Sequence, residues 1–310
     1  MTGWIAIDGG QSEVRLRHSG AGSSVLRGPG YVHGPQGVGR IVDAICHAVA
    51  DSPPPTGATV GLGHTGHPSD DAGKAELGAA LLEMFDASEV RTAPDWVTAH
   101  LGALEGAPGI VIAVGTGAVC LGSAPDRPSV VVGGWGPVFG DAGSAFWIGR
   151  AGIEAALRHE DGRATTPQLH AVTKRVFGAD LHVATDQLYA APDLVDRVAR
   201  FAPHVLQAAR DGDGIAGDVV SRAVDAYVEM IRVAAEQLHP GPAPTISYVG
   251  GVLAGAPHLV DLLRAELVRA LPSAQLVAPA GDSLAGAQLL ASTATHPFDD
   301  LVVRTPRSTP

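Results

Sequence analysis

The chain has 310 residues, of which 45% are hydrophobic, and a net charge of −11. This length predicts roughly two domains, and the acidic balance argues against a nucleic-acid or anionic-membrane surface. The longest apolar stretch, 109–122, is too short to span a bilayer, and no signal-peptide pattern opens the chain. We therefore expect a globular cytoplasmic protein with neither a nucleic-acid nor a membrane partner.

Cysteine is rare, with only Cys46 and Cys120, each in an apolar context. Two cysteines cannot form a disulfide framework or a Cys-rich metal site, so we expect two buried, unreactive thiols.

The chain begins with a predicted strand over 4–8, the turn Gly9-Gly10-Gln11-Ser12 and a second strand over 13–16. A strand follows the glycines, so this is no dinucleotide fingerprint, and the usual P-loop is excluded because Gly-Lys-Ser/Thr is absent. The N–H groups and Ser12 hydroxyl of such a turn can bind phosphate, and Asp8 can hold hydrated Mg²⁺. An ordinary hairpin turn is the alternative.

The next elements alternate between loops, helices and strands. His33 lies in a Gly-Pro-rich loop over 28–34, where it either lines a site or caps the loop. Periodicity predicts helices over 37–50 and 71–86 and strands over 58–62 and 89–92. The histidines of Gly63–Pro68 have no third metal ligand nearby, which favours a solvated loop. Asp95 lies between a strand and a helix predicted over 96–105, where a carboxylate is either an N-cap or a catalytic base.

A second strand–glycine turn–strand unit follows, with strands over 109–114, 118–122 and 129–132 around Gly115-Thr116-Gly117. It repeats the plan of the first hairpin. Two such hairpins can hold one polyphosphate from both sides.

Residues 133–149 combine many glycines with Trp135, Trp147 and Asp141. With a helix starting at Ser144, a small ligand here would meet both a carboxylate and a helix N-terminus. A Gly-rich loop with two core tryptophans is the alternative.

The remaining chain is mainly helical, with helices predicted over 144–159, 165–177, 192–209, 215–238, 257–270 and 283–293. Gly212-Asp213 is expected to form a loop and N-cap before the longest of them. Strands are predicted over 245–249 and 275–278, and Gly250-Gly251 follows the first of these strands. Residues 295–310 are expected to trail, partly disordered. The alternation predicts an α/β fold with three strand-end glycine turns around one cleft.

This arrangement resembles the actin-like ATPase superfamily, with its ribonuclease H-like two-domain fold. It is most similar to the N-acetylglucosamine kinase branch, which is grouped with the BadF–BadG–BcrA–BcrD ATPases that activate reductases. The shared residues are Ile7–Gly10, Gly115–Gly117, Gly133–Gly136, Gly140–Ala145, Gly212-Asp213, Gly250-Gly251 and Ala285-Gly286-Ala287. The resemblance implies an α/β domain over 1–106, on which the tail 288–310 packs, and a second over 107–287.

The resemblance also implies roles. Asp95 matches the carboxylate that accepts the proton of a sugar 6-hydroxyl, and Asp8 matches a holder of Mg²⁺. The other implied contacts are those to ATP (Gly9, Gly10, Gln11, Ser12, Gly115, Thr116, Gly117, Asp213, Gly250, Gly251) and to the sugar (His33, Gly134, Trp135, Gly136, Asp141). The implied cofactors are ATP and Mg²⁺, and the implied partner is a small sugar. A homodimer is the default assembly.

The sequence departs from N-acetylglucosamine kinases at Val32, where an Asn usually precedes the His. A contact to the N-acetyl sugar is then missing, which favours phosphorylation of the D-glucosamine 6-hydroxyl, with N-acetylglucosamine as the near alternative. A non-kinase ATPase switch or sensor is the second hypothesis. The iron–sulfur function of the reductase activators is disfavoured, because Cys46 falls in a predicted helix and Cys120 in a predicted strand.

Overall fold

The computed structural model describes residues 3–11, 13–20, 24–31, 37–50, 52–125, 127–238 and 244–307. The chain divides into two compact units. Unit 1 comprises Met1–Val111, Leu121–Val130 and Val277–Pro310, and unit 2 comprises Ile112–Cys120 and Val131–Leu276. The domain limits at residues 106 and 287, which the family resemblance implies, remain predictions. Ser12 and His33 lie outside the described residues.

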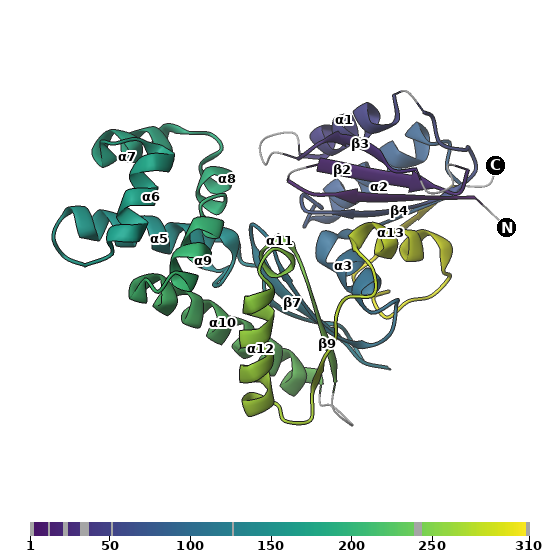
Figure 1. The fold of residues 1–310 in the computed structure, drawn as a ribbon. Helices are drawn as coiled ribbons and strands as arrows, with labels where there is room; N and C mark the ends of the chain where they lie inside the picture. Colours follow the sequence, from purple (N-terminus) through teal and green to yellow (C-terminus); the bar gives the residue numbers. More distant parts are fainter. Residues whose placement is uncertain are drawn as a thin grey trace. The chain divides into compact units, whose positions relative to one another are not determined.

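Unit 1 is built on a six-stranded sheet in the order β11-β5-β4-β1-β2-β3 (Figure 1). Its strands are β1 Trp4–Gly9, β2 Glu13–His18, β3 Leu26–Pro29, β4 Thr59–His64, β5 Glu89–Pro94 and β11 Val303–Pro306. The central strands β1, β4 and β5 are parallel, whereas β2 and β11 pair antiparallel with β1 and β5. The carboxyl ends of the three parallel strands therefore meet at one edge of the sheet. Strand β3, at the start of the predicted loop over 28–34, was not expected.

Helices cover both faces of this sheet (Figure 1). Alternate residues of β1 point to opposite faces. Ile5 and Ile7 join the core beneath α1 Gly37–Val49 and α2 Asp71–Met84, while Ala6 packs against α13 Ser283–Ser292. Helix α13 also packs along α3 Asp95–Ala103.

The α3–α13 contact brings two helix backbones unusually close together. A Cβ atom added to Gly286 would lie 1.8 Å from the Thr98 carbonyl oxygen, and one added to Gly102 would lie 2.0 Å from the Asp282 carbonyl oxygen. Only glycine fits at these two positions. This explains physically why the Ala285-Gly286-Ala287 motif carries a glycine.

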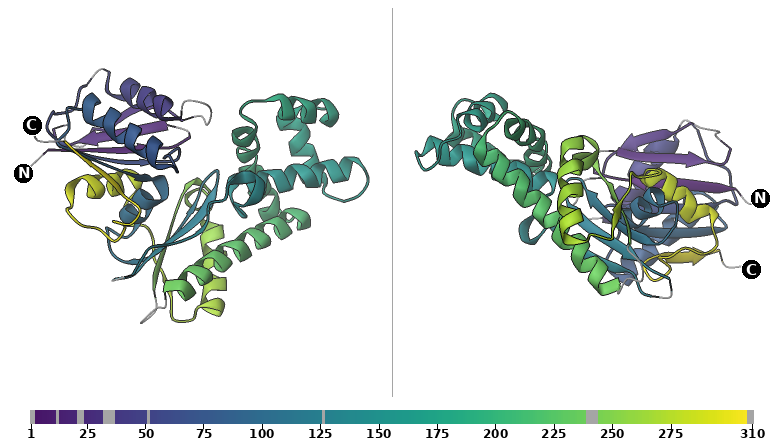
Figure 2. Two further views of the ribbon diagram at one scale, coloured as in Figure 1. Left: turned by 180° about the vertical axis from the view of Figure 1, so that it is seen from behind. Right: turned by 60° about the horizontal axis from the view of Figure 1, so that its bottom comes forward.

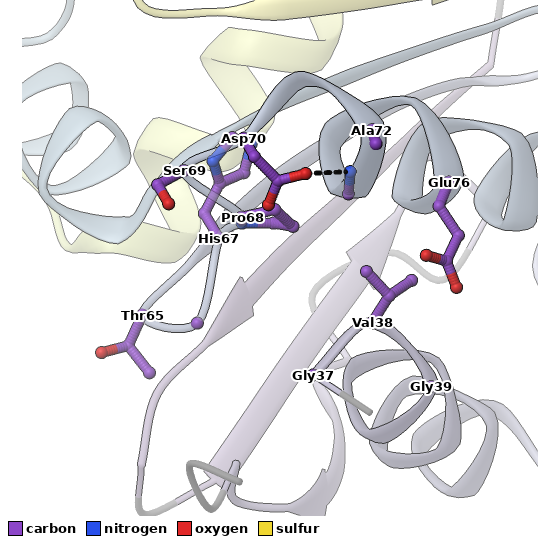
Figure 3. Close-up of a pocket in the computed structure, with 12 residues that line it drawn as sticks. Gly37, Val38, Gly39, Thr65, His67, Pro68, Ser69, Asp70, Ala72 and Glu76 are labelled. Atoms are coloured by element: carbon purple, nitrogen blue, oxygen red, sulfur yellow. Dashed lines mark hydrogen bonds between the residues drawn. The ribbon is translucent and has the colours of Figure 1, made fainter. Parts of the chain in front are cut away.

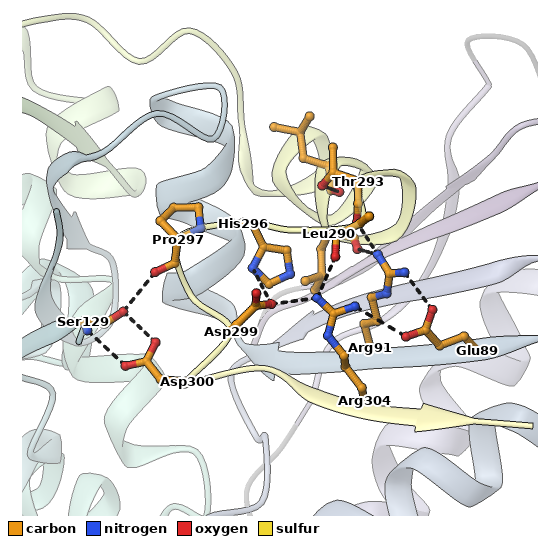
Figure 4. Close-up of polar contacts among 12 residues, drawn as sticks. Glu89, Arg91, Ser129, Leu290, Thr293, His296, Pro297, Asp299, Asp300 and Arg304 are labelled. Carbon is orange, nitrogen blue, oxygen red and sulfur yellow. Dashed lines mark hydrogen bonds and ion pairs between the residues drawn. The ribbon is translucent and has the colours of Figure 1, made fainter. Parts of the chain in front are cut away.

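The segment after α13 is ordered through residue 307, so the expectation of a partly disordered tail is wrong there. Strand β11 pairs with β5, and the Arg91 guanidinium donates to the carbonyl oxygens of Leu290, at 3.0 Å, and Thr293 (Figure 4). The Asp300 carboxylate accepts from the Ser129 amide at 3.0 Å. The composition of 295–307 looks loop-like, but these long-range bonds order it.

Unit 2 carries most of a second sheet, with strand order β10-β9-β6-β7-β8. These strands are β6 Gly109–Val114, β7 Ala118–Ser123, β8 Val130–Gly133, β9 Thr245–Val249 and β10 Gln275–Leu276. The helices are α4 Gly136–Phe139, α5 Ala145–Glu160, α6 Pro167–Phe177, α7 Leu181–Ala190, α8 Leu194–Ala199, α9 Ala202–Arg210, α10 Gly214–Leu238, α11 Gly251–Ala254 and α12 Pro257–Ala270. Helices α10 and α12 pack side by side (Figure 2).

The structure of this helical region differs from the sequence prediction in two places. The single helix expected over 192–209 is two helices, α8 and α9, and Pro203 lies in the first turn of the second. Proline suits a first helical turn because the missing N–H has no partner there. Helix α7 was not anticipated. Its N-cap is Asp180, whose carboxylate accepts from the amides of His182 and Val183.

The two cysteines differ in exposure. Cys120 is buried, as expected, and burial raises the pKa of its thiol. Cys46 is exposed, which contradicts the prediction of a buried thiol, because it lies on the outer side of α1 next to the buried Ile45. Among the described residues, no helix combines the length and apolar character needed to cross a membrane.

Candidate active site

The carboxyl edge of the unit 1 sheet brings together three polar residues. Strand register pairs Gly9 with His64 and His64 with Pro94. The residues that leave these strands, Thr65 and Asp95, therefore emerge beside the end of β1, which carries Asp8. Ligands of open α/β sheets bind at this edge.

Asp8 is held by an arginine that faces it across the hairpin. In the β1–β2 register Asp8 pairs with Arg15, whose Nη2 and Nε lie 2.5 Å and 3.0 Å from Asp8 Oδ2. Arg15 Nη1 also lies 2.7 Å from Asp282 Oδ2. Burial raises the pKa of Asp8, although Arg15 opposes the shift. This network was not expected from the sequence. The Asp8–Arg15 pair could have been found from hairpin register, but Asp282 could not.

The first glycine turn is tightly packed. A Cβ atom on Gly9 would lie 2.0 Å from the His64 ring, so the strand end tolerates only glycine. The Gly10 amide donates to the Glu13 carbonyl oxygen at 3.0 Å, and the Tyr31 amide donates to the Gly10 carbonyl oxygen at 3.0 Å. Gln11 follows and is half-buried.

Asp95 is the first residue of α3, and the N-cap position is occupied by Pro94 without a side-chain cap bond. Asp95 is therefore not the N-cap. Its carboxylate accepts from the Thr65 hydroxyl and the Trp96 amide. The pKa of Asp95 is raised to about 6, mainly by burial and secondly by the negative charge of Asp8. Strongly shifted carboxyl groups of this kind are typical of functional sites.

The segment 63–68 is not the solvated loop expected from its composition. His64 is fully buried at the end of β4 and meets Tyr31 edge-on, with ring centroids 4.9 Å apart. Burial and Lys74 lower the pKa of His67 to about 4, and its Nε2 lies 3.1 Å from the Thr92 hydroxyl oxygen. No group of three potential metal ligands occurs among the described residues.

A pocket of about 800 Å³ lies beside this segment, between the N-terminal ends of α1 and α2 (Figure 3). Its polar lining includes Thr65, His67, Asp70 and Glu76. Asp70 is already engaged as the N-cap of α2, where its carboxylate accepts from the Gly73 amide at 2.9 Å. Thr65 thus lies at the border between this pocket and Asp95.

The second glycine turn, in unit 2, is bonded to helix α5. The Gly115 amide donates to the Gly117 carbonyl oxygen at 2.9 Å. The carbonyl oxygens of Gly115 and Thr116 accept from the Ala145 and Phe146 amides. The Ser144 hydroxyl accepts from the Trp147 amide at 3.1 Å. The first N–H groups of α5 are therefore used internally, which contradicts the expectation that a ligand meets an open helix N-terminus here.

Asp141 lies in a strained loop and is almost fully buried. Its φ is +55°, an uncommon value for a residue other than glycine, and it is 7% exposed. Burial raises the pKa of its carboxyl group, although the backbone amides of Ala118 and Gly136 oppose the shift. Its Oδ1 atom is buried and has no hydrogen-bond partner among the described residues. The nearby Tyr227 hydroxyl donates to the Gly143 carbonyl oxygen.

The glycines at 133, 134 and 136 all have positive φ, between +74° and +82°. Trp135 is 78% exposed, so the alternative of two core tryptophans is wrong for it. Trp147 is half-buried, with the Arg222 guanidinium 5.0 Å from its ring centroid.

The predicted nucleotide residues of unit 2 have clear local roles. The Asp213 carboxylate caps α10 by accepting from the Ile215 and Ala216 amides, as expected, and it also accepts from the Thr166 hydroxyl at 2.6 Å. Gly250 has φ +98°, and a Cβ atom there would lie 2.3 Å from the Val114 carbonyl oxygen. Gly251 begins α11 and has open space around it.

Two α/β units with these sheets and strand-end glycine turns define the actin-like ATPase fold, which confirms the predicted fold class. The chain belongs to the BadF/BadG/BcrA/BcrD ATPase family, which matches residues 21–291. This confirms the resemblance seen in the sequence.

Individual relatives carry sugar-kinase names. The chain is 26% identical over 192 residues to an N-acetylmuramic acid/N-acetylglucosamine kinase of Clostridium acetobutylicum, covering 61% of this chain and 63% of the relative. It is 27% identical over 196 residues to an N-acetyl-D-glucosamine kinase of Dictyostelium discoideum, covering 59% of each. The chain thus spans about three fifths of these curated relatives.

A solved structure of a protein described as an N-acetylglucosamine kinase, from Chromobacterium violaceum, is similar over a longer stretch. It superposes with a TM-score of 0.74 at 27% identity, covering 94% of this chain and 99% of that one.

Proposed function

We propose that the protein is an ATP-dependent kinase that transfers the γ-phosphate of ATP to the 6-hydroxyl of an amino sugar, with N-acetylglucosamine as the preferred substrate. The observation that carries the proposal is Asp95, a half-buried residue whose carboxyl group has a raised pKa and lies near Asp8 at the carboxyl edge of the sheet. The names of the relatives support the N-acetylated sugar better than free D-glucosamine, which Val32 alone favours.

In this proposal Asp95 orients the sugar hydroxyl and accepts its proton. Phosphoryl transfer needs in-line positioning and neutralised charge more than covalent chemistry. The remaining proposed contacts are with ATP (Gly9, Gly10, Gln11, Ser12, Gly115, Thr116, Gly117, Asp213, Gly250, Gly251) and with the sugar (His33, Gly134, Trp135, Gly136, Asp141).

Asp8 fits the role of the Mg²⁺ holder. Mg²⁺ usually binds one or two carboxylates and keeps several waters beside substrate phosphates. Asp8 supplies one such carboxylate, and Arg15 occupies only its Oδ2 atom. When bound, Mg²⁺ would neutralise charge on the transferring phosphate.

A panel of sugars with ATP and Mg²⁺, read by ADP release, tests the substrate. We expect ADP release to depend on sugar and to be fastest with N-acetylglucosamine. Faster turnover of D-glucosamine would reverse the order of the two substrates. Sugar-independent hydrolysis would instead support the second candidate, an ATPase switch or sensor, for which the family name is the specific observation.

The raised pKa of Asp95 predicts the pH dependence of this reaction. Because the proposed base must be ionised, kcat/KM for the sugar should rise with pH through about 6 and level off above it. Well below that pH it should fall about tenfold per unit. A pH profile of the initial rate measures this, and an acidic limb near the ordinary Asp value of about 4 would contradict it.

A further inference from the structure

Thr65 has no role in the chemistry described above, yet it touches two parts of the proposed site within unit 1. It follows β4 directly, and the pairing of His64 with Pro94 places it next to Asp95, which follows β5 in the same way. Its amide donates to the Gly9 carbonyl oxygen at 2.9 Å, in the first glycine turn. Its hydroxyl donates to the Asp95 carboxylate.

The backbone around Thr65 is held rigidly. The Gly66 amide donates to His64 Nδ1 at 2.8 Å, and the His67 amide donates to the His64 carbonyl oxygen at 3.1 Å. A Cβ atom on Gly66 would lie 2.5 Å from the Tyr31 ring, so the turn is closely packed as well. In Figure 3 the Thr65 side chain points away from Val38 and Glu76 on the far side of the pocket. The backbone position from which the Thr65 hydroxyl extends is therefore fixed.

A carboxylate at the first position of a helix can rotate about χ1 and χ2 unless its oxygens are bonded. The amides of Asp95 and Trp96 and the Thr65 hydroxyl are the described groups that bond the Asp95 carboxylate. Both amides belong to α3, so among the described residues Thr65 is the bonded group that comes from another element. Its own amide links it to Gly9, in the first glycine turn. A misplacement of about 1 Å at a reacting group can cost about 100-fold in rate.

We propose that Thr65 is a positioning residue, which aims the Asp95 carboxylate at the sugar hydroxyl and fixes its distance from the first glycine turn. The proposal rests on the proposed kinase function. Thr65 itself exchanges no proton with the substrate.

Two variants separate the hydroxyl from the shape of the side chain. Thr65→Val keeps the volume and removes the hydroxyl, and it should lower kcat for sugar phosphorylation about 10- to 100-fold with little change in KM for ATP. Thr65→Ser restores the hydroxyl and should recover most of kcat. A role in folding alone would not give this split and rescue. Thr92→Val is the matched control, because the Thr92 hydroxyl bonds His67 instead, and it should keep kcat within about twofold.

Crystal structures of the wild type, Thr65→Val and Thr65→Ser provide a readout that does not depend on kinase activity. We expect a single Asp95 side-chain conformer in the wild type and the serine variant. In the valine variant we expect a rotated Asp95 side chain or two alternate conformers. An unchanged Asp95 in Thr65→Val, or a serine variant as slow as the valine variant, would overturn the positioning role. Failure of the kinase proposal is recognised separately, by a wild type that releases no ADP with any sugar.

Discussion

Asp95→Asn is expected to lower kcat for sugar phosphorylation by about 10²–10⁴-fold, the usual contribution of a positioned general base. Asparagine has nearly the same shape and can still accept from Thr65, but it cannot take the proton. Binding of a non-hydrolysable ATP analogue, measured by calorimetry, should stay near the wild-type value. A variant with an unchanged kinase rate would show that Asp95 is not the base.

The same variant should change stability in a direction that can be predicted. The folded state raises the pKa of Asp95 from its ordinary 3.8 to about 6, so folding disfavours the ionised form. At pH 8 the carboxylate is ionised both folded and unfolded, and asparagine should stabilise the fold by up to about 3 kcal/mol. Near pH 4 the folded protein already carries a neutral carboxyl group, and most of the gain should disappear.

A matched control for both effects is Asp71→Asn. Asp71 is a fully exposed carboxylate in unit 1, in the first turn of α2, and its ion-pair partner among the described residues is Lys74. We expect its kinase rate to be unchanged and its stability to change by no more than about 0.5 kcal/mol at either pH.

Gly286→Ala is expected to destabilise the protein by about 3 kcal/mol or more, the upper end of the range for overpacked cores. The added methyl group would meet backbone, the Thr98 carbonyl oxygen and the Gly102 amide, so no side-chain rotation can relieve the clash. Helix α3 must then move away from α13, and because Asp95 begins α3, kcat should fall together with the unfolding midpoint.

Gly217→Ala is the control for this substitution. Gly217 lies within α10, and a Cβ atom there would meet nothing within 4 Å. Alanine should therefore stabilise that helix by about 0.5–1 kcal/mol. Urea unfolding of both variants measures the contrast, and equal midpoints would show that the backbones of α3 and α13 are not in close contact at Gly286.

Features that depend on a few neighbouring residues, such as short strands and helix caps, are predicted correctly from the sequence. The strands that end at Gly9 and Val249 are short apolar runs closed by glycines, and both are present. Asp213 was expected as an N-cap because it precedes a long periodic segment, and it has that role. Capping and periodicity act over a few residues, so a single sequence contains the necessary information.

What the sequence does not predict depends on distant partners. Strand β11 has a polar, Pro-containing sequence and becomes a strand only because β5 offers it an edge. The contact of Asp282 with Arg15 joins residues 267 positions apart. The amides at the start of α5 looked open to a ligand because the carbonyl oxygens that occupy them belong to another turn.

The chain order of unit 1 has a consequence for how the protein is made. Its sheet is completed by β11 and its α3 face is covered by α13, and both lie after the last residue of unit 2. A chain leaving the ribosome therefore releases every residue of unit 2 before unit 1 can close. Until then β5 has an open strand edge, which is a known site of mispairing. Nascent chains that stop before residue 283 should depend on chaperones, even though all three glycine turns have already emerged.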